Sequence, residues 1–150
     1  MQDYLRIVKW HTAKIDKQAR WLKNKHKSAL VWFTGLSASG KSSIAVDLEQ
    51  KLYHHQIMTF VLDGDNVRHG LNKDLGFSVA DRKENLRRVG EVARLLVDAG
   101  ILTIAAFISP SLEDRQAVRK LFHQGEFVEV FLKCDLAVCE ARDPKPSVSI

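Results

Sequence analysis

Four apolar runs alternate along the chain with stretches in which apolar residues recur every three or four positions. The runs cover residues 30–34, 57–62, 101–108 and 127–132. The first run carries no alternating polar residue, which predicts a strand buried on both faces. Strands that alternate with amphipathic helices predict an α/β fold with an open, mostly parallel sheet and right-handed crossovers.

The stretches between the runs predict helices over about residues 12–25, 41–55, 78–99 and 111–123, followed by a short one from Asp135. Ser78 is expected to cap the third helix, with Asp81 as its capping-box partner, and Gly100 to end it. The side chains expected to face the core from the first four helices are Ile15, Ala19, Leu22, Ile44, Ala45, Leu48, Leu52, Leu86, Val89, Ala93, Leu96, Leu112, Ala117, Leu121 and Phe122. The short helix carries Val138 and Cys139.

A glycine-bounded loop follows the first apolar run and has the spacing G-x-x-x-x-G-K-[ST]. Gly35 and Gly40 let backbone N–H groups converge on a polyphosphate, Lys41 brings a positive charge to the β- and γ-phosphates, and Ser42 can bind Mg²⁺. A helix that begins at Lys41 adds the positive end of its dipole. The sequence therefore predicts an ATP-type nucleotide site. Its expected residues are Gly35, Leu36, Ser37, Ala38, Ser39, Gly40, Lys41, Ser42 and Ser43.

Length and composition indicate one soluble globular domain of 150 residues, with 45% hydrophobic and 27% charged residues. No apolar run is long enough for a membrane span or a secretory signal, so the cytoplasm is the expected location. Cys134 and Cys139 lack metal-ligand spacing and are expected to be reduced.

The positive charge is concentrated at the N-terminus, where residues 1–28 hold eight Lys or Arg and two Asp. A solvated helix face docked on the domain is favoured over a nucleic-acid or membrane contact. The expected organisation is a basic arm over residues 1–28, a kinase-like core over 29–143 and an irregular tail over 144–150.

The second apolar run ends in an acidic cluster that discriminates among nucleotide-binding proteins. Asp63 and Asp65 are expected to face the glycine loop, because ligands bind beyond the carboxyl ends of parallel strands. The sequence has no D-x-x-G motif, and Asn72-Lys73-Asp74 lacks the N-K-x-D spacing, which argues against a GTPase. An acid at this place suits a small-molecule kinase, in which it meets Mg²⁺ and the acceptor hydroxyl. Ser42 and Asp63 are the expected metal ligands.

The chain resembles the adenylylsulfate kinases of sulfate assimilation in the runs WFTGLSASGKSS, LDGDNVRHGLNKDLGFSVADRKENLRRVGEVARL, AAFISP, EVFL and CEARDP. The resemblance covers about residues 28–144 and implies a P-loop NTPase-like three-layer fold. It also implies transfer of the ATP γ-phosphoryl group to the 3′-hydroxyl of adenosine 5′-phosphosulfate. The implied acceptor-side residues are Asp63, Asp65, Arg68, Phe77, Arg82, Asn85, Ile108 and Ser109, and the implied catalytic residues are Lys41, Asp63 and Ser109.

Two of the implied roles agree with the chemistry of the residues, and one does not. Arg68 and Arg82 suit the phosphosulfate, because guanidinium groups match tetrahedral anions, and Phe77 offers a face for adenine. In the family, the serine at the position of Ser109 is described as a phosphoserine intermediate. No base lies beside Ser109 in the sequence, so direct in-line transfer is favoured, with Ser109 as a pocket residue.

The resemblance stops near residue 144, where family members continue with a basic lid, a phenylalanine that stacks on adenine, and a last strand. The expectation from the sequence is that this strand and the lid are missing. One alternative follows from this: a nucleotide-binding remnant with weak catalysis, since lost cations cost transition-state stabilisation. A second alternative, independent of the missing lid, is another small-metabolite P-loop kinase. A homodimer is left open, with no nucleic acid or membrane partner expected.

Overall fold

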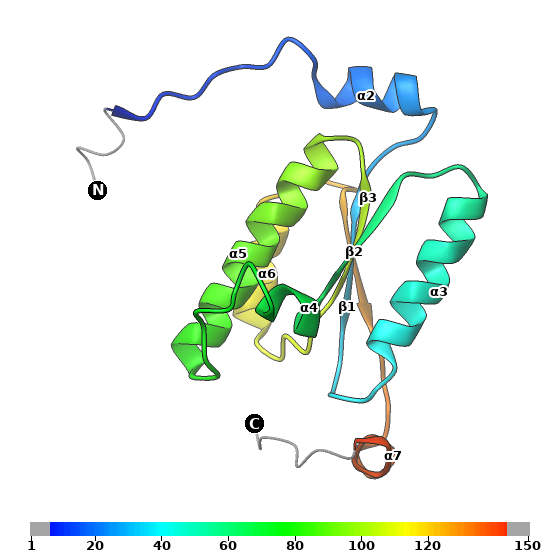
Figure 1. The fold of residues 1–150 in the computed structure, drawn as a ribbon, viewed down its shortest axis with the longest axis vertical. Coiled ribbons are helices and arrows are strands. Elements are labelled where there is room, and N and C mark those ends of the chain that lie inside the picture. The colour runs from blue at the N-terminus through cyan, green and yellow to red at the C-terminus, as the bar shows by residue number, and fades with distance from the viewer. Residues whose placement is uncertain (1–6, 144–150) are drawn as a thin grey trace.

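The computed structural model describes residues 7–143, and its centre is a four-stranded sheet (Figure 1). The strands are β1 (Leu30–Thr34), β2 (Thr59–Asp63), β3 (Leu102–Ala106) and β4 (Phe127–Phe131), in the spatial order β2-β3-β1-β4. All three strand pairs are parallel, which confirms the predicted fold class. The carboxyl ends of the strands therefore meet at one edge of the sheet.

Helices cover both faces of the sheet, α3 on one and α5 with α6 on the other, so the fold has three layers (Figure 1). The helices of the described residues are α2 (Lys17–Asn24), α3 (Lys41–His54), α4 (Gly64–Arg68), α5 (Val79–Asp98), α6 (Leu112–Arg119) and α7 (Leu136–Arg142). The sequence did not predict α4, whose five residues follow β2 directly. The tail predicted for residues 144–150 lies outside the described residues.

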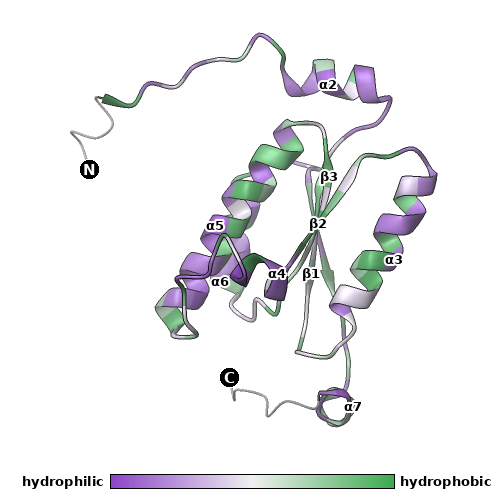
Figure 2. Ribbon diagram, viewed as in Figure 1, coloured by the Kyte–Doolittle hydropathy of each residue, from purple (hydrophilic) through white to green (hydrophobic). Residues whose placement is uncertain are grey.

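The core consists of two apolar layers, one on each side of the sheet, because side chains alternate along a strand. Leu30 and Trp32 of β1 point toward α5 and α6, where the Trp32 ring stacks on Phe107 and Phe127 at centroid distances of 5.3 and 6.2 Å. Phe33 points to the opposite layer, beneath α3. Figure 2 shows hydrophobic residues in the strands and along parts of α3 and α5.

Two helices differ from the predicted apolar stripes, α3 at one residue and α6 in the face that it buries. Ile44 is exposed on α3, and Leu112 and Ala117 are exposed on α6, so these three predictions are wrong. Val118 is buried instead. A Cβ atom at Gly90 would lie 3.2 Å from both γ-carbons of Val118, which shows that α6 approaches α5 at this glycine. The close approach turns Val118 toward the core. On the short helix α7, Cys139 is buried and Val138 is exposed.

The N-terminal arm forms a helix, as predicted, but its apolar stripe does not face the core. Leu22 is 82% exposed and Ile15 is also exposed. Polar contacts hold α2 against the domain: Lys17 lies 2.6 Å from Glu126, and Trp21 Nε1 donates to Ser28 Oγ at 2.6 Å. Because these partners lie on the other side of the helix, α2 turns its apolar residues toward solvent.

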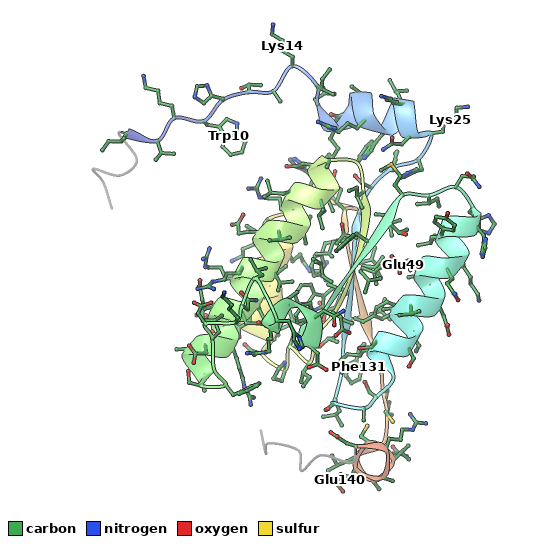
Figure 3. The ribbon with its side chains drawn as sticks, viewed as in Figure 1. Trp10, Lys14, Lys25, Glu49, Phe131 and Glu140 are labelled. Atoms are coloured by element: carbon green, nitrogen blue, oxygen red, sulfur yellow. The ribbon has the colours of Figure 1, made fainter. Side chains whose placement is uncertain are left out.

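The segment before α2 leads away from the domain, and Trp10 lies on it (Figure 3). In Figure 1, α2 lies near one end of the sheet, and the glycine loop and α7 lie near the other. Within residues 7–143, no helix is long and apolar enough to cross a membrane.

Candidate active site

The glycine loop turns from β1 into α3 with positive φ angles at Gly35 (152°), Ala38 (59°) and Gly40 (97°). The Lys41 side chain folds back over this loop and is 7% exposed. Its Nζ atom donates to the carbonyl oxygens of Gly35 at 2.9 Å and Leu36 at 2.5 Å. Burial lowers the pKa of Lys41, although the charges of Cys139 and Asp63 oppose this effect. The loop thus positions a partly desolvated cation by means of its own backbone.

Gly35 and Gly40, at the two ends of the glycine loop, have different surroundings. A Cβ atom at Gly35 would lie 2.8 Å from the carbonyl oxygen of Leu132, just after β4. Nothing lies within 4 Å of a Cβ atom at Gly40. Gly35 is therefore required for packing as well as for backbone conformation, and Gly40 for conformation only.

The carboxyl end of β2 contacts the nucleotide loop, our name for residues 35–43 of the glycine loop and the start of α3, through one short hydrogen bond. Ser42 Oγ, in the first turn of α3, donates to Asp63 Oδ2 at 2.6 Å. The other carboxylate oxygen of Asp63 accepts from the backbone N–H of Asp65 at 3.0 Å and caps α4. These oxygens are of the kind that Mg²⁺ prefers. The described residues contain no group of three or more His, Cys, Asp or Glu side chains that could form an all-protein metal site.

The end of β3 contributes Ser109, which is 3% exposed and has a positive φ of 38°. A chain of hydrogen bonds runs through its hydroxyl group. Trp32 Nε1 donates to Ser109 Oγ at 3.0 Å, Ser109 Oγ donates to Thr34 Oγ1 at 2.7 Å, and Thr34 Oγ1 donates to the Ile108 carbonyl at 2.8 Å. No titratable side chain of the described residues hydrogen-bonds to the Ser109 hydroxyl. Ile108 itself is exposed at this edge.

Residues 69–78, which we call the acceptor loop, connect α4 to α5. The guanidinium group of Arg68 lies 4.4 Å from the centroid of the Phe77 ring, and its Nη1 donates to the Gly76 carbonyl at 3.1 Å. Phe77 remains 63% exposed. Arg68 and Phe77, which the sequence predicts for one pocket, are therefore in direct contact.

Arg82 and Asn85 lie in the first two turns of α5, as predicted. Arg82 is half-buried, and it forms no ion pair within residues 7–143. Asn85 is 5% exposed, and its Oδ1 atom accepts a hydrogen bond from Asn72 of the acceptor loop at 2.9 Å. Arg82 is thus a cation available for an anionic ligand.

The acceptor loop is braced from α5. Arg88 forms two hydrogen bonds to the Asp74 carboxylate, at 2.7 and 3.0 Å, and a third to Glu84 at 3.0 Å. These contacts lower the pKa of Asp74, and hydrogen bonds from Arg87 and Arg88 lower the pKa of Glu84 from 4.5 to about 2. Ser78 caps α5 by accepting from Asp81 N–H, as predicted. The Asp81 carboxylate, however, accepts from Gly76 N–H rather than closing a capping box.

Sequence reasoning assigned no role to two residues of α7 and its end. Arg142 lines a cavity of about 420 Å³ together with Ala38, Gly40, Lys41, Ser42 and Ser43. Ser37 Oγ donates to Asp143 Oδ2 at 3.2 Å. Both residues belong to the CEARDP run, and this match to the family was the sequence signal that could have identified them.

Cys134 and Cys139 are free thiols, and burial raises the pKa of Cys139.

A family model described as adenylylsulphate kinase matches residues 27–147. The adenylyl-sulfate kinase of Staphylococcus epidermidis is 59% identical over 138 residues, which cover 92% of this chain and 69% of that protein. The chain belongs to the adenylylsulphate kinase family. This confirms the resemblance to adenylylsulfate kinases that the sequence motifs indicated.

Solved structures of adenylylsulphate kinases share the fold. The Mycobacterium tuberculosis APS kinase in complex with AMPPNP and APS superposes with a TM-score of 0.76 at 55% identity, covering 79% of this chain and 70% of that chain. The hexameric APS kinase from Thiobacillus denitrificans gives a TM-score of 0.66 at 39% identity, covering 71% of this chain and 22% of that chain.

Proposed function

We propose that this protein transfers the γ-phosphoryl group of ATP to the 3′-hydroxyl of adenosine 5′-phosphosulfate. The observation that carries the proposal is the 2.6 Å contact between Ser42 and Asp63, which joins the nucleotide loop to the acceptor end of β2. The similarity of this protein to a kinase whose structure was solved with AMPPNP and APS supports the proposal that it binds ATP and adenosine 5′-phosphosulfate. The products are ADP and the 3′-phosphorylated nucleotide.

On the nucleotide side, the backbone of residues 35–43 and the N-terminus of α3 hold the phosphates of ATP. Lys41 exchanges its present acceptors, the carbonyls of Gly35 and Leu36, for phosphate oxygens. Its charge then offsets the negative charge that develops on the transferring group. Arg142 is suitably placed to contact the same nucleotide.

Ser42 and Asp63 are the residues that would hold Mg²⁺, because their oxygens already lie side by side at the start of α3 and the end of β2. Bound there, the ion would neutralise charge on the β- and γ-phosphates. Ser42 and Asp63 would each supply one oxygen ligand. This number is typical of Mg²⁺ sites in nucleotide-binding proteins, where phosphates and water supply the remaining ligands.

On the acceptor side, Asp63 and Asp65 face the hydroxyl group that is phosphorylated. Arg68 and Arg82 bind the phosphosulfate, because neither guanidinium group forms an ion pair within residues 7–143 and each can pair with the anion. Phe77 supplies a surface for the adenine ring. Asn85, Ile108 and Ser109 complete the pocket.

Transfer is direct, without a phosphoserine at position 109. The Ser109 hydroxyl is buried and accepts from Trp32, and the proton that it would have to lose in order to act as a nucleophile is donated to the Thr34 hydroxyl, which is not a base. No neighbouring base is hydrogen-bonded to it to take its proton. Ser109 therefore shapes the pocket wall.

The identity to named adenylyl-sulfate kinases over most of the chain favours this function over the two alternatives raised from the sequence, a weakly catalytic nucleotide binder and a kinase for another small metabolite. A homodimer stays a prediction.

The test is turnover by the purified protein with ATP, Mg²⁺ and a panel of acceptors, with product separated by anion exchange. Adenosine 5′-phosphosulfate should be phosphorylated with the highest kcat/KM. The 3′-deoxy analogue should bind without reacting, and AMP, which lacks the sulfate, should react far more slowly. Preference for a nucleoside or a sugar would contradict the proposal.

A further inference from the structure

Asn72 and Asn85 form a buried amide pair between the acceptor loop and α5. Asn72 is fully buried, and Asn85 is 5% exposed. Asn72 Nδ2 donates to Asn85 Oδ1 at 2.9 Å and lies 3.5 Å from the Asn85 backbone carbonyl. The backbone holds Asn72 in place separately, because its N–H donates to the Val67 carbonyl at 2.8 Å. The orientation of the Asn72 side chain is therefore not needed to keep its backbone in position.

The four polar atoms of this pair are used unequally. Asn72 Oδ1 is the one fully buried side-chain polar atom in residues 7–143 that has no hydrogen-bond partner. Asn85 Nδ2 also forms no hydrogen bond within these residues, yet it is not among the fully buried atoms. The N–H₂ group is consequently the part of the Asn85 amide that keeps some exposure and has donors to offer to a ligand. A fully buried, unpartnered carbonyl oxygen is costly, so the pair keeps this arrangement at the expense of stability.

We propose that Asn72 is a positioning residue that fixes the amide orientation of Asn85, so that Asn85 presents its N–H₂ group to the acceptor nucleotide. This inference rests on the proposed function. If the Asn72 amide rotated by 180°, its Oδ1 atom would face Asn85. Asn85 would then have to donate from Nδ2 to this oxygen, and its own Oδ1 atom would point to the site. The present orientation makes Asn85 a hydrogen-bond donor, which selects a ligand with a ring nitrogen or an oxygen acceptor at that point.

Two substitutions test the orientation from opposite sides. Asn72→Asp keeps the shape but offers Asn85 an acceptor, which favours the reversed amide of Asn85. Asn72→Leu removes both polar atoms, including the unpartnered oxygen, and leaves Asn85 free to turn. Both variants should raise the KM for adenosine 5′-phosphosulfate about tenfold, the effect of losing one hydrogen bond. The KM for ATP should stay within about twofold of wild type, because the nucleotide loop is untouched.

The matched control is Lys73→Ala, an exposed neighbour on the same loop that should leave both KM values unchanged. Thermal unfolding separates the proposal from a structural role. Asn72→Leu should unfold at the wild-type temperature or above it while its acceptor KM rises. An unchanged acceptor KM in Asn72→Leu, or a rise that merely follows a lower unfolding temperature and affects both substrates equally, overturns the proposal. If Asn72→Asp does not fold, Asn72→Leu decides alone.

A measurement on the ligand-free protein keeps this test independent of the reaction. Hydrogen exchange of the side-chain amides by NMR should show slow exchange for Asn72 N–H₂ and fast exchange for Asn85 N–H₂. Slow exchange of the Asn85 N–H₂ as well would overturn the assigned orientation even if the kinase reaction is confirmed, because a reversed Asn85 amide would donate to Asn72. Conversely, a wild-type protein that shows the expected order but does not phosphorylate adenosine 5′-phosphosulfate would refute the proposed function alone.

Discussion

The nucleotide loop and the acceptor loop lie at the same edge of the sheet but are held in different ways. In the nucleotide loop, Lys41 bonds to carbonyls five and six residues before it, so the loop is closed by its own sequence. In the acceptor loop, Asp74 is held by Arg88, fourteen residues away on α5, and Asn72 is held against Asn85. The conformation of the nucleotide loop is therefore held by contacts within the loop, whereas that of the acceptor loop depends on the packing of the long helix α5.

This difference indicates how each half should respond to damage. A change in the nucleotide loop removes a group that acts directly on phosphates and should mainly lower catalysis. A change in the brace around the acceptor loop should loosen the position of several side chains together and should mainly raise the KM for the acceptor. The predictions below are ordered by the size of the expected effect.

Lys41→Ala should give the largest loss. It removes the charge that offsets the transferring phosphoryl group, so kcat/KM for ATP should fall by about 10²–10³. Lys51→Ala, an exposed lysine on the same helix, is the control and should retain wild-type kinetics. Steady-state turnover at varied ATP measures both. A Lys41→Ala enzyme with normal turnover would remove the nucleotide loop from the catalytic role.

Arg82→Ala should affect the acceptor half alone. Losing a charge-assisted contact to the phosphosulfate should weaken acceptor binding about 10- to 100-fold. ATP binding, measured by calorimetry, should stay unchanged. Lys83→Ala is the neighbouring control, because Lys83 points to Glu113 on α6. Equal losses for both ligands would place Arg82 outside the acceptor pocket.

Ser109→Ala should cost only a few-fold in kcat, because it removes a packing and hydrogen-bonding group from the pocket wall rather than a nucleophile. Radiolabelled ATP should leave no phosphate on the wild-type protein or on the variant. Detection of a phosphoprotein that forms and decays as fast as turnover, and that disappears in Ser109→Ala but not in Ser111→Ala, would show that direct transfer is wrong.

The brace itself should make stability depend on pH. The pKa of Glu84 falls from 4.5 to about 2 in the folded protein, so its hydrogen bonds to Arg87 and Arg88 stabilise the fold above pH 4.5. This stabilisation is lost as the pH falls from 4.5 toward 2. These three side chains lie at the surface and are partly open to solvent, so the effect should be a few degrees in unfolding temperature and should shrink at high salt. Glu84→Gln should show a shallower acid slope than wild type, and an identical slope would contradict this role.

The sequence predicted most of what is local. The apolar runs gave β1 without error, and the glycine spacing predicted a loop that turns directly into α3 at Lys41. Ser78 was identified as the cap of α5 because a cap is a contact across three residues. The placement of Asp63 against Ser42 followed from the geometry of parallel strands, in which the carboxyl ends meet at one edge.

Contacts between distant segments could not be read in the same way. Periodicity placed Leu112 and Ala117 inward on α6, but the gap at Gly90 on α5 rotates that helix toward Val118. It likewise placed Leu22 inward, whereas the ion pair between Lys17 and Glu126 orients α2. Nothing in the local pattern around Asn72 indicates a partner thirteen residues away, since the turn that joins them has no regular period.

The unequal surroundings of Gly35 and Gly40 have a consequence for a library of substitutions across the nucleotide loop. At Gly40 the space is open and the backbone is left-handed, so asparagine, which tolerates that conformation, should yield a well-expressed protein whose defect appears only in turnover. At Gly35 any side chain meets the Leu132 carbonyl, so variants should be depleted in a screen for cellular abundance before activity is scored. Measuring cellular abundance and turnover for every variant would therefore separate the two glycines, although the sequence motif requires glycine at both positions.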